Sequence, residues 1–204
     1  MIKQPQNDVL LEGRVLSAPT FSHENHSTPF YRFLLEIPRL SGQADCLPVL
    51  TNPAFLPQIT AGESLRLTGQ LRSFNNRSGV GNRLVLTIYL QEILPPEGEF
   101  CNRILLTGTI CKPPIFRRTP LGRSICDLML AVPRPYGRAD YLPVIAWGQV
   151  ASQVSRCGVG DPLSLEGRVQ SRLYHKATEE GTQERTAYEV SVMHLLTAEE
   201  AMGT

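Results

Sequence analysis

The sequence predicts an all-β protein made of two tandem five-stranded Greek-key barrels, each with one short helix between its third and fourth strands. Three observations support this prediction: a repeat along the chain, a two-residue alternation of apolar side chains, and glycines inside the alternating segments. The length of 204 residues allows one or two domains. The hydrophobic content of 42% is sufficient for a core in each.

The repeat consists of four segments of the first half that recur in the same order in the second half. Three pairs are related by an offset of 95 residues, and the fourth pair by an offset of 98. A constant offset that then increases by three indicates a duplication followed by one loop insertion. The matched segments are 9–15 and 104–110, 35–39 and 130–134, 45–49 and 140–144, and 61–69 and 159–167.

The joint between the halves lies at Pro95–Glu99, a run of turn-forming residues. We therefore expect an N-terminal domain at residues 1–97 and a C-terminal domain at residues 98–204.

The alternation defines the strands of each half. In the second half, Leu163, Leu165, Gly167 and Val169 alternate with polar residues, which is typical of a half-buried strand. Residues 149–157 instead have helical spacing and end at Gly158. The order strand, strand, strand, helix, strand, strand is that of the OB-fold.

Two polar segments are expected to be loops, namely residues 17–30 and 177–185.

Glycines fall inside the expected strands at Gly13, Gly69, Gly108 and Gly167. In a small barrel, glycines at such positions allow a strand to bend and close the barrel.

The net charge of +1 excludes binding to a polyanion through bulk charge alone. The basic residues are biased in kind, because only Lys3, Lys112 and Lys176 are lysines and the other 17 are arginines. Arginine bonds phosphates with two donors and stacks on bases and aromatic rings.

The patterns of cysteine, histidine and apolar residues argue against a metal-binding protein, a secreted protein and a membrane protein. The five cysteines and four histidines have no zinc-binding spacing, so we expect free thiols in a reducing cytoplasm, no metal and no cofactor. No apolar run is long enough to span a membrane, and the N-terminus lacks a secretory signal.

A constellation that can bind unpaired bases lies on the second half. Alternation places Tyr141 and Trp147 on the outer face of the third strand and Arg168, Arg172 and Tyr174 on that of the fourth. Aromatic and arginine side chains on an exposed sheet face form a stacking platform for single-stranded nucleic acid. The alternative is that these aromatics contact the other barrel or a neighbouring subunit.

The second half resembles the bacterial single-stranded DNA-binding protein family. The resemblance rests on Asn102–Thr109, Thr119–Arg123, Leu130–Val132, Tyr141–Gly160 and Leu165–Arg172. It implies an OB barrel that binds single-stranded DNA without sequence preference. It also implies that Tyr136, Tyr141, Trp147 and Tyr174 occupy stacking positions of the family, three of which are usually tryptophan. The remaining residues that we expect to contact nucleic acid in this half are Arg123, Arg168, Arg172 and Lys176.

The first half departs from this family pattern. By the repeat offsets, its equivalents of the stacking residues are Ser41, Cys46, Asn52 and Asn76. On the outer face of its fourth strand it keeps Phe74 beside Arg72, with Arg77 in the following hairpin. We expect Arg72, Phe74 and Arg77 to form a weaker contact with the strand.

The chain stops shortly after its last expected strand, without the acidic tail of the family. In this respect it is similar to the primosomal replication protein N. Serine, histidine and carboxylate residues show no nucleophile–base spacing, so we expect no enzyme activity and no catalytic residues.

The sequence thus predicts a single-stranded DNA-binding protein of replication, recombination or repair. Because the family assembles four barrels, we expect a homodimer of two-barrel chains, with replication or primosome proteins as further partners. Two alternatives stay open: a primosome-type accessory protein that acts through protein contacts, and an RNA-binding OB protein.

Overall fold

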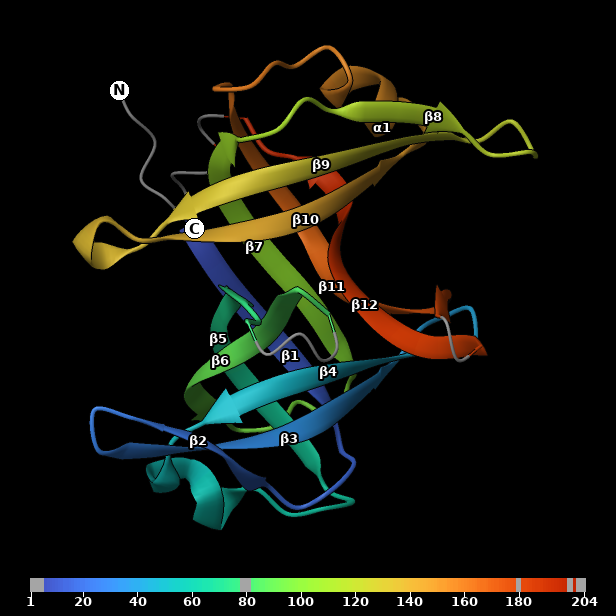
Figure 1. Cartoon of the computed structure of the whole chain (residues 1–204). Helices are drawn as coiled ribbons and strands as arrows, with labels where there is room; N and C mark the ends of the chain where they lie inside the picture. The colour runs from blue at the N-terminus through green and yellow to red at the C-terminus, as the bar shows by residue number, and fades with distance from the viewer. Residues whose placement is uncertain (1–5, 78–81, 179–180, 198–199, 201–204) are drawn as a thin grey trace. The chain divides into compact units, whose positions relative to one another are not determined.

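The computed structural model of this chain describes residues 6–77, 82–178, 181–197 and 200. Most of these residues lie in β-strands, which confirms the all-β class. Figure 1 shows the strands of the first half in blue to green and those of the second half in green to red.

The first half forms a closed barrel. Its β1 pairs with β5 and also with β3, where Arg14 lies opposite Glu36, and β4 pairs with β6 in parallel at Val49 and Ile88. The closed order β1-β3-β4-β6-β5 is that of an OB barrel. The elements are β1 (Gln6–Val15), β2 (Thr20–Asn25), β3 (Thr28–Pro38), β4 (Ala44–Thr51), the 3-10 helix η1 (Pro53–Gln58), β5 (Ser64–Asn75) and β6 (Leu84–Leu94).

The second half closes in the same way. Its β7 pairs with β11 and with β9, where Thr109 lies opposite Ala131, and β10 pairs with β12 in parallel at Val144 and Val190. The elements are β7 (Cys101–Ile110), β8 (Ile115–Arg118), β9 (Ser124–Pro133), the 3-10 turn η2 (Pro135–Gly137), β10 (Ala139–Trp147), α1 (Gly148–Val154), β11 (Pro162–Thr178) and β12 (Gly181–Leu195).

The two expected loops are largely strands, so both predictions were wrong. Within residues 17–30, β2 pairs with the start of β3, and His26 and Ser27 turn the chain with φ of 47° and 61°. Two consecutive residues with positive φ are typical of a tight hairpin turn. Within residues 177–185, β11 continues to Thr178 and β12 begins at Gly181.

The glycines inside the strands permit close approach of neighbouring strands. A Cβ atom at Gly13 would lie 2.5 Å from the Glu36 carbonyl oxygen, and one at Gly69 would lie 2.4 Å from that of Tyr89. In the second half, Gly167 faces the Ser191 carbonyl oxygen at the same 2.4 Å. Any side chain at these positions would force the strands apart.

The chain divides into two compact units. Residues 10–102 and 170–188 form one, here named the first-barrel unit, and the other described residues form the second-barrel unit. The outer parts of β11 and β12 thus belong with the first barrel, whereas the boundary at residues 97 and 98 stays a prediction. Within the described part of the chain, no helix is long and apolar enough to cross a membrane.

Candidate nucleic-acid interface

The outer face of β10 in the second-barrel unit presents two of the expected aromatic residues. The pleat of the strand buries Leu142, Val144 and Ala146 in the barrel core. Tyr141 lies on the opposite face and is 50% exposed, and Trp147 on that face is half-buried. Tyr141 therefore offers a ring to a ligand from solvent.

Trp147 is in contact with an arginine that the sequence placed separately. The guanidinium carbon of Arg123 lies 5.6 Å from the centre of the Trp147 ring, which is a cation–π distance. Arg123 is held by the turn after β8, where its amide N–H donates to Thr119 Oγ1 at 3.0 Å. The structure thus brings an aromatic ring and a positive charge together at one end of β10.

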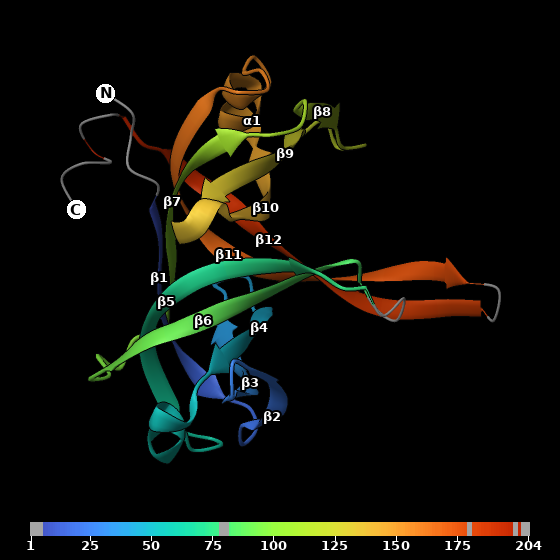
Figure 2. The same ribbon diagram turned by 60° about the vertical axis from the view of Figure 1, so that its left-hand side comes forward.

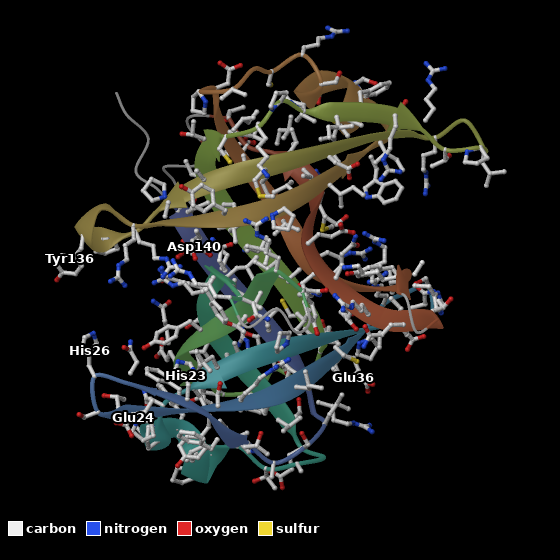
Figure 3. The ribbon with its side chains drawn as sticks, viewed as in Figure 1. His23, Glu24, His26, Glu36, Tyr136 and Asp140 are labelled. Atoms are coloured by element: carbon white, nitrogen blue, oxygen red, sulfur yellow. The ribbon has the colours of Figure 1, made fainter. Side chains whose placement is uncertain are left out.

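Tyr136 lies in the turn between β9 and β10. Its side chain is 100% exposed, and its backbone is left-handed with φ of 64°. Figure 3 shows the ring at the outer end of this turn. Because a left-handed conformation is unfavourable for a residue with a side chain, the turn holds Tyr136 outward at a cost in stability.

Arg168, the other expected residue of this unit, is half-buried on β11. Its neighbour Glu166 is paired with Arg103 at 2.8 Å. Between β8 and β9, Arg117 pairs with Asp127 at 2.8 Å, and this hydrogen bond raises the pKa of Arg117. These paired arginines are less available to a phosphate than Arg123.

In the first-barrel unit, the expected residues Arg77, Tyr174 and Lys176 line one pocket of about 420 Å³. The pocket is formed by two hairpins, β5–β6 from the first half and β11–β12 from the second half. Its other described lining residues are Asn76, Asn82, Arg83 and Arg185. Four of the seven described lining side chains are cationic, and none of the seven is a carboxylate.

Hydrogen bonds hold the two hairpins together at this pocket. The Tyr174 hydroxyl donates to Asn82 Oδ1 at 2.9 Å, and Asn82 Nδ2 donates to the Thr186 carbonyl oxygen at 2.7 Å. The guanidinium carbon of Arg172 lies 6.0 Å from the centre of the Tyr174 ring. Figure 2 shows the end of the β5–β6 hairpin beside the β11–β12 hairpin.

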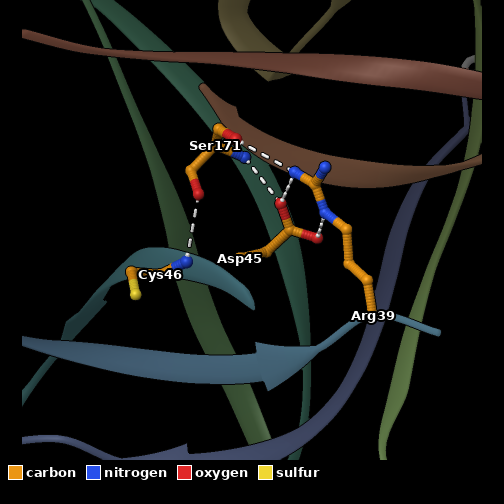
Figure 4. Close-up of polar contacts among 4 residues, drawn as sticks. All are labelled: Arg39, Asp45, Cys46 and Ser171. Atoms are coloured by element: carbon orange, nitrogen blue, oxygen red, sulfur yellow. Dashed lines mark hydrogen bonds and ion pairs between the residues drawn. The ribbon is translucent and has the colours of Figure 1, made fainter. Parts of the chain in front are cut away.

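A second set of contacts fixes β11 against β4 at Ser171, and we name it the Ser171 clamp (Figure 4). The Ser171 N–H donates to Asp45 Oδ1 at 2.8 Å, and the Ser171 carbonyl oxygen accepts from Arg39 at 3.0 Å. Its hydroxyl oxygen accepts from the Cys46 N–H at 3.1 Å. Arg39 also pairs with Asp45, whose side chain is only 1% exposed. All three polar groups of Ser171 are therefore bonded to residues 39–46.

Arg72 and Phe74 lie on β5 and do not line the pocket. Phe74 is exposed, and Arg72 donates to the Gln70 side chain. Of these three expected residues, only Arg77 lines the pocket.

Several polar residues and an aromatic cluster were missed from the sequence. Arg185, Asn76 and Asn82 line the pocket, and alternation along a continuous β12 would have identified Arg185. On β2, β3 and β6 the rings form three contacts: Phe21 with Tyr31, His23 with Phe30, and Phe30 with Tyr89. The first half therefore carries more clustered aromatic rings than the comparison of the two repeats indicated.

Comparison with known proteins shows what the second half of the chain is similar to. Residues 101–197 match the Single-strand binding protein family. The chain is 34% identical over 80 residues to Single-stranded DNA-binding protein 3 of Listeria innocua, covering 36% of this chain and 50% of that protein. It is 31% identical over 80 residues to Single-stranded DNA-binding protein of Halalkalibacterium halodurans, covering 36% of this chain and 48% of that protein.

The chain spans about half the length of these relatives. A similar solved structure is that of the wild-type single-stranded DNA binding protein from Thermus aquaticus, with a TM-score of 0.71 and 21% identity over 95% of this chain and 93% of that one. This likeness shows the fold. Together the matches confirm the resemblance to the bacterial family of single-stranded DNA-binding proteins.

Proposed function

We propose that this chain binds single-stranded DNA with little sequence preference, by stacking bases on aromatic rings and pairing arginines with phosphates. The observation that carries the proposal is the outer face of β10, where the exposed Tyr141 and the half-buried Trp147 beside Arg123 lie within the segment that matches the family. Stacking is tolerant of sequence because every base has an aromatic face. No cofactor is needed for such binding.

The setting we propose is the transient single-stranded DNA of replication, recombination or repair in a reducing cytoplasm. The five cysteines, which are all free thiols, support that compartment. We further propose that two chains associate as a homodimer, which light scattering tests directly: a strict monomer at micromolar concentration would remove this part of the proposal.

A titration with oligo-dT at low salt tests the DNA binding. Trp147 is the only tryptophan, so its emission should be quenched when a base or phosphate displaces or joins Arg123 over its ring. Unchanged emission together with no binding by fluorescence anisotropy of a labelled oligonucleotide would refute the proposal. Competition with oligo-U distinguishes DNA from RNA as the preferred ligand.

Alanine variants test the residues. Tyr141→Ala and Tyr174→Ala should each weaken binding by about 1–3 kcal/mol if the rings stack on bases, and Phe74→Ala should cost less. Phe100→Ala is a matched control, since this exposed aromatic lies outside the proposed surface. If Phe74→Ala costs more than Tyr141→Ala, the expectation that Arg72, Phe74 and Arg77 form the weaker contact is wrong.

A further inference from the structure

We propose that the pocket between the β5–β6 and β11–β12 hairpins is a phosphate-binding site that the two halves of the chain share. Each hairpin supplies two of its four cations: Arg77 and Arg83 come from the first half, and Lys176 and Arg185 from the second. Neither hairpin alone carries the site. The ligand class is a phosphate group, and its source is the backbone of a bound single strand; the choice of source rests on the proposed function.

The charge of the pocket calls for an anion. Four cationic side chains line a space of about 420 Å³, and no carboxylate is among the described lining residues. On β11 and β12, the described ion pair of His175 with Glu184 at 3.8 Å involves residues that do not line the pocket. Like charges held close together repel, and a bound phosphate converts that repulsion into attraction.

The pocket is also assembled without a ligand. Asn82 connects the hairpins by accepting from Tyr174 and donating to Thr186, at 2.9 and 2.7 Å. Three residues before Tyr174, the Ser171 clamp fixes β11 to β4. Because these bonds already join the two hairpins that carry the cations, little ordering of the backbone is needed when a phosphate binds.

The size and lining of the pocket suit a nucleotide unit better than a bare ion. Pockets for small molecules begin at about 300 Å³, and this one exceeds that volume. Tyr174 adds an aromatic ring and Asn76 and Asn82 add amide groups beside the cations. A phosphate can therefore bind the cations while the attached sugar and base lie against Tyr174.

A double-mutant cycle tests whether the two hairpins act on the same phosphate. The variants are Arg83→Ala, Lys176→Ala and their combination, with binding of labelled oligo-dT measured at several salt concentrations. Each single change should weaken binding about tenfold, as expected for one charge-assisted hydrogen bond. The fold-loss of oligo-dT affinity in the double variant should differ by about threefold or more from the product of the two single fold-losses, because residues that act on one group are coupled. The salt dependence should also become shallower, by about 0.7 in the logarithmic slope for each phosphate that the protein no longer neutralises.

Arg156→Ala is the matched control, because Arg156 is an exposed cation after α1 and not in the pocket. It should leave the slope and affinity close to those of the unchanged protein. If the pocket variants bind oligo-dT as the control does while the unchanged protein binds it tightly, the inference is overturned and the proposed function stands. Independent, purely multiplicative effects of the two variants would also overturn a shared site.

Inorganic pyrophosphate separates the inference from the proposed function. A ligand that binds only the folded protein raises its melting temperature. If pyrophosphate raises the melting temperature of the unchanged protein but not of the double variant, and oligo-dT does not bind, the phosphate pocket is retained and single-stranded DNA binding is refuted. A coupled cycle with oligo-dT and no effect of pyrophosphate assigns the pocket to the strand backbone. If neither ligand acts through Arg83 and Lys176, no phosphate binds there and the inference is wrong.

Discussion

Removal of the buried carboxylate of the Ser171 clamp should destabilise the first-barrel unit far more than removal of an exposed one. Asp45 is 1% exposed and Arg39 is 16% exposed. Asp45→Asn keeps the shape of the side chain and an acceptor for the Ser171 N–H, but it removes the charge that pairs with Arg39. The perturbation therefore isolates the ion pair.

The magnitude follows from the burial of each partner. Breaking a buried pair costs about 3–5 kcal/mol because the remaining charge is left without a partner. Arg39 can partly reach water, so Asp45→Asn should cost about 2–3 kcal/mol, below that range. Arg39→Ala leaves the fully buried carboxylate of Asp45 unpaired and should cost the full range of about 3–5 kcal/mol. The two variants should therefore differ in their loss of stability because Asp45 is more deeply buried than Arg39.

Differential scanning calorimetry provides the measurement, with Asp127→Asn as the control. Asp127 and its partner Arg117 are 39% and 52% exposed, so their pair should contribute less than about 1 kcal/mol. For a chain of this size, each kcal/mol corresponds to about 2–4 °C in melting temperature. The reasoning is refuted if Asp45→Asn lowers the melting temperature no more than Asp127→Asn does.

Three further changes test other parts of the structure. Cys46→Tyr should cost about 1–3 kcal/mol by overpacking, because a large ring replaces a half-buried thiol, measured by urea unfolding, and it should not strengthen oligo-dT binding. Tyr136→Gly relieves the strain of a left-handed residue with φ of 64° but increases the conformational entropy of the unfolded chain. The free energy of unfolding should therefore change by less than about 1 kcal/mol, while oligo-dT binding weakens. A loss of stability without a loss of binding would contradict this. Burial raises the pKa of Tyr188 above its ordinary 10.0, although Arg32 opposes the shift. The contribution of the protonated Tyr188 to stability is therefore complete below about pH 10 and is lost as pH rises through the folded-state pKa. Tyr188→Phe should consequently lose less stability at alkaline pH than the unchanged protein. Unfolding followed by circular dichroism over this pH range measures the difference.

The barrels could be predicted from the sequence because one face of each core strand is buried. Along β11, Leu163, Leu165 and Val169 are buried as the alternation indicated. The two hairpins mistaken for loops lack this signal, because every residue of β2 is exposed and the outer end of β11 is exposed or half-buried. A strand with solvent on both faces has no apolar period to read.

The candidate site was only partly predictable for a related reason. Tyr141 and Trp147 lie on a strand whose other face is apolar, so their direction follows from the pleat. The Ser171 clamp joins Asp45 to a residue 126 positions away through polar atoms only. Such a contact leaves no periodic pattern, and a buried aspartate is indistinguishable in sequence from an exposed one. The same holds for Asn82, which bridges two hairpins through its side-chain amide.

The Ser171 clamp also lies at one of the positions where the first half lacks an aromatic residue of the second half. The repeat offset makes Cys46 the equivalent of Tyr141, which is 50% exposed on the second barrel. At Cys46 the backbone N–H is instead bonded to the Ser171 hydroxyl oxygen, so β11 lies beside β4 at this position. In the first barrel, this edge of β4 therefore holds a strand of the same chain, and that strand brings two side chains of the second half to the cationic pocket.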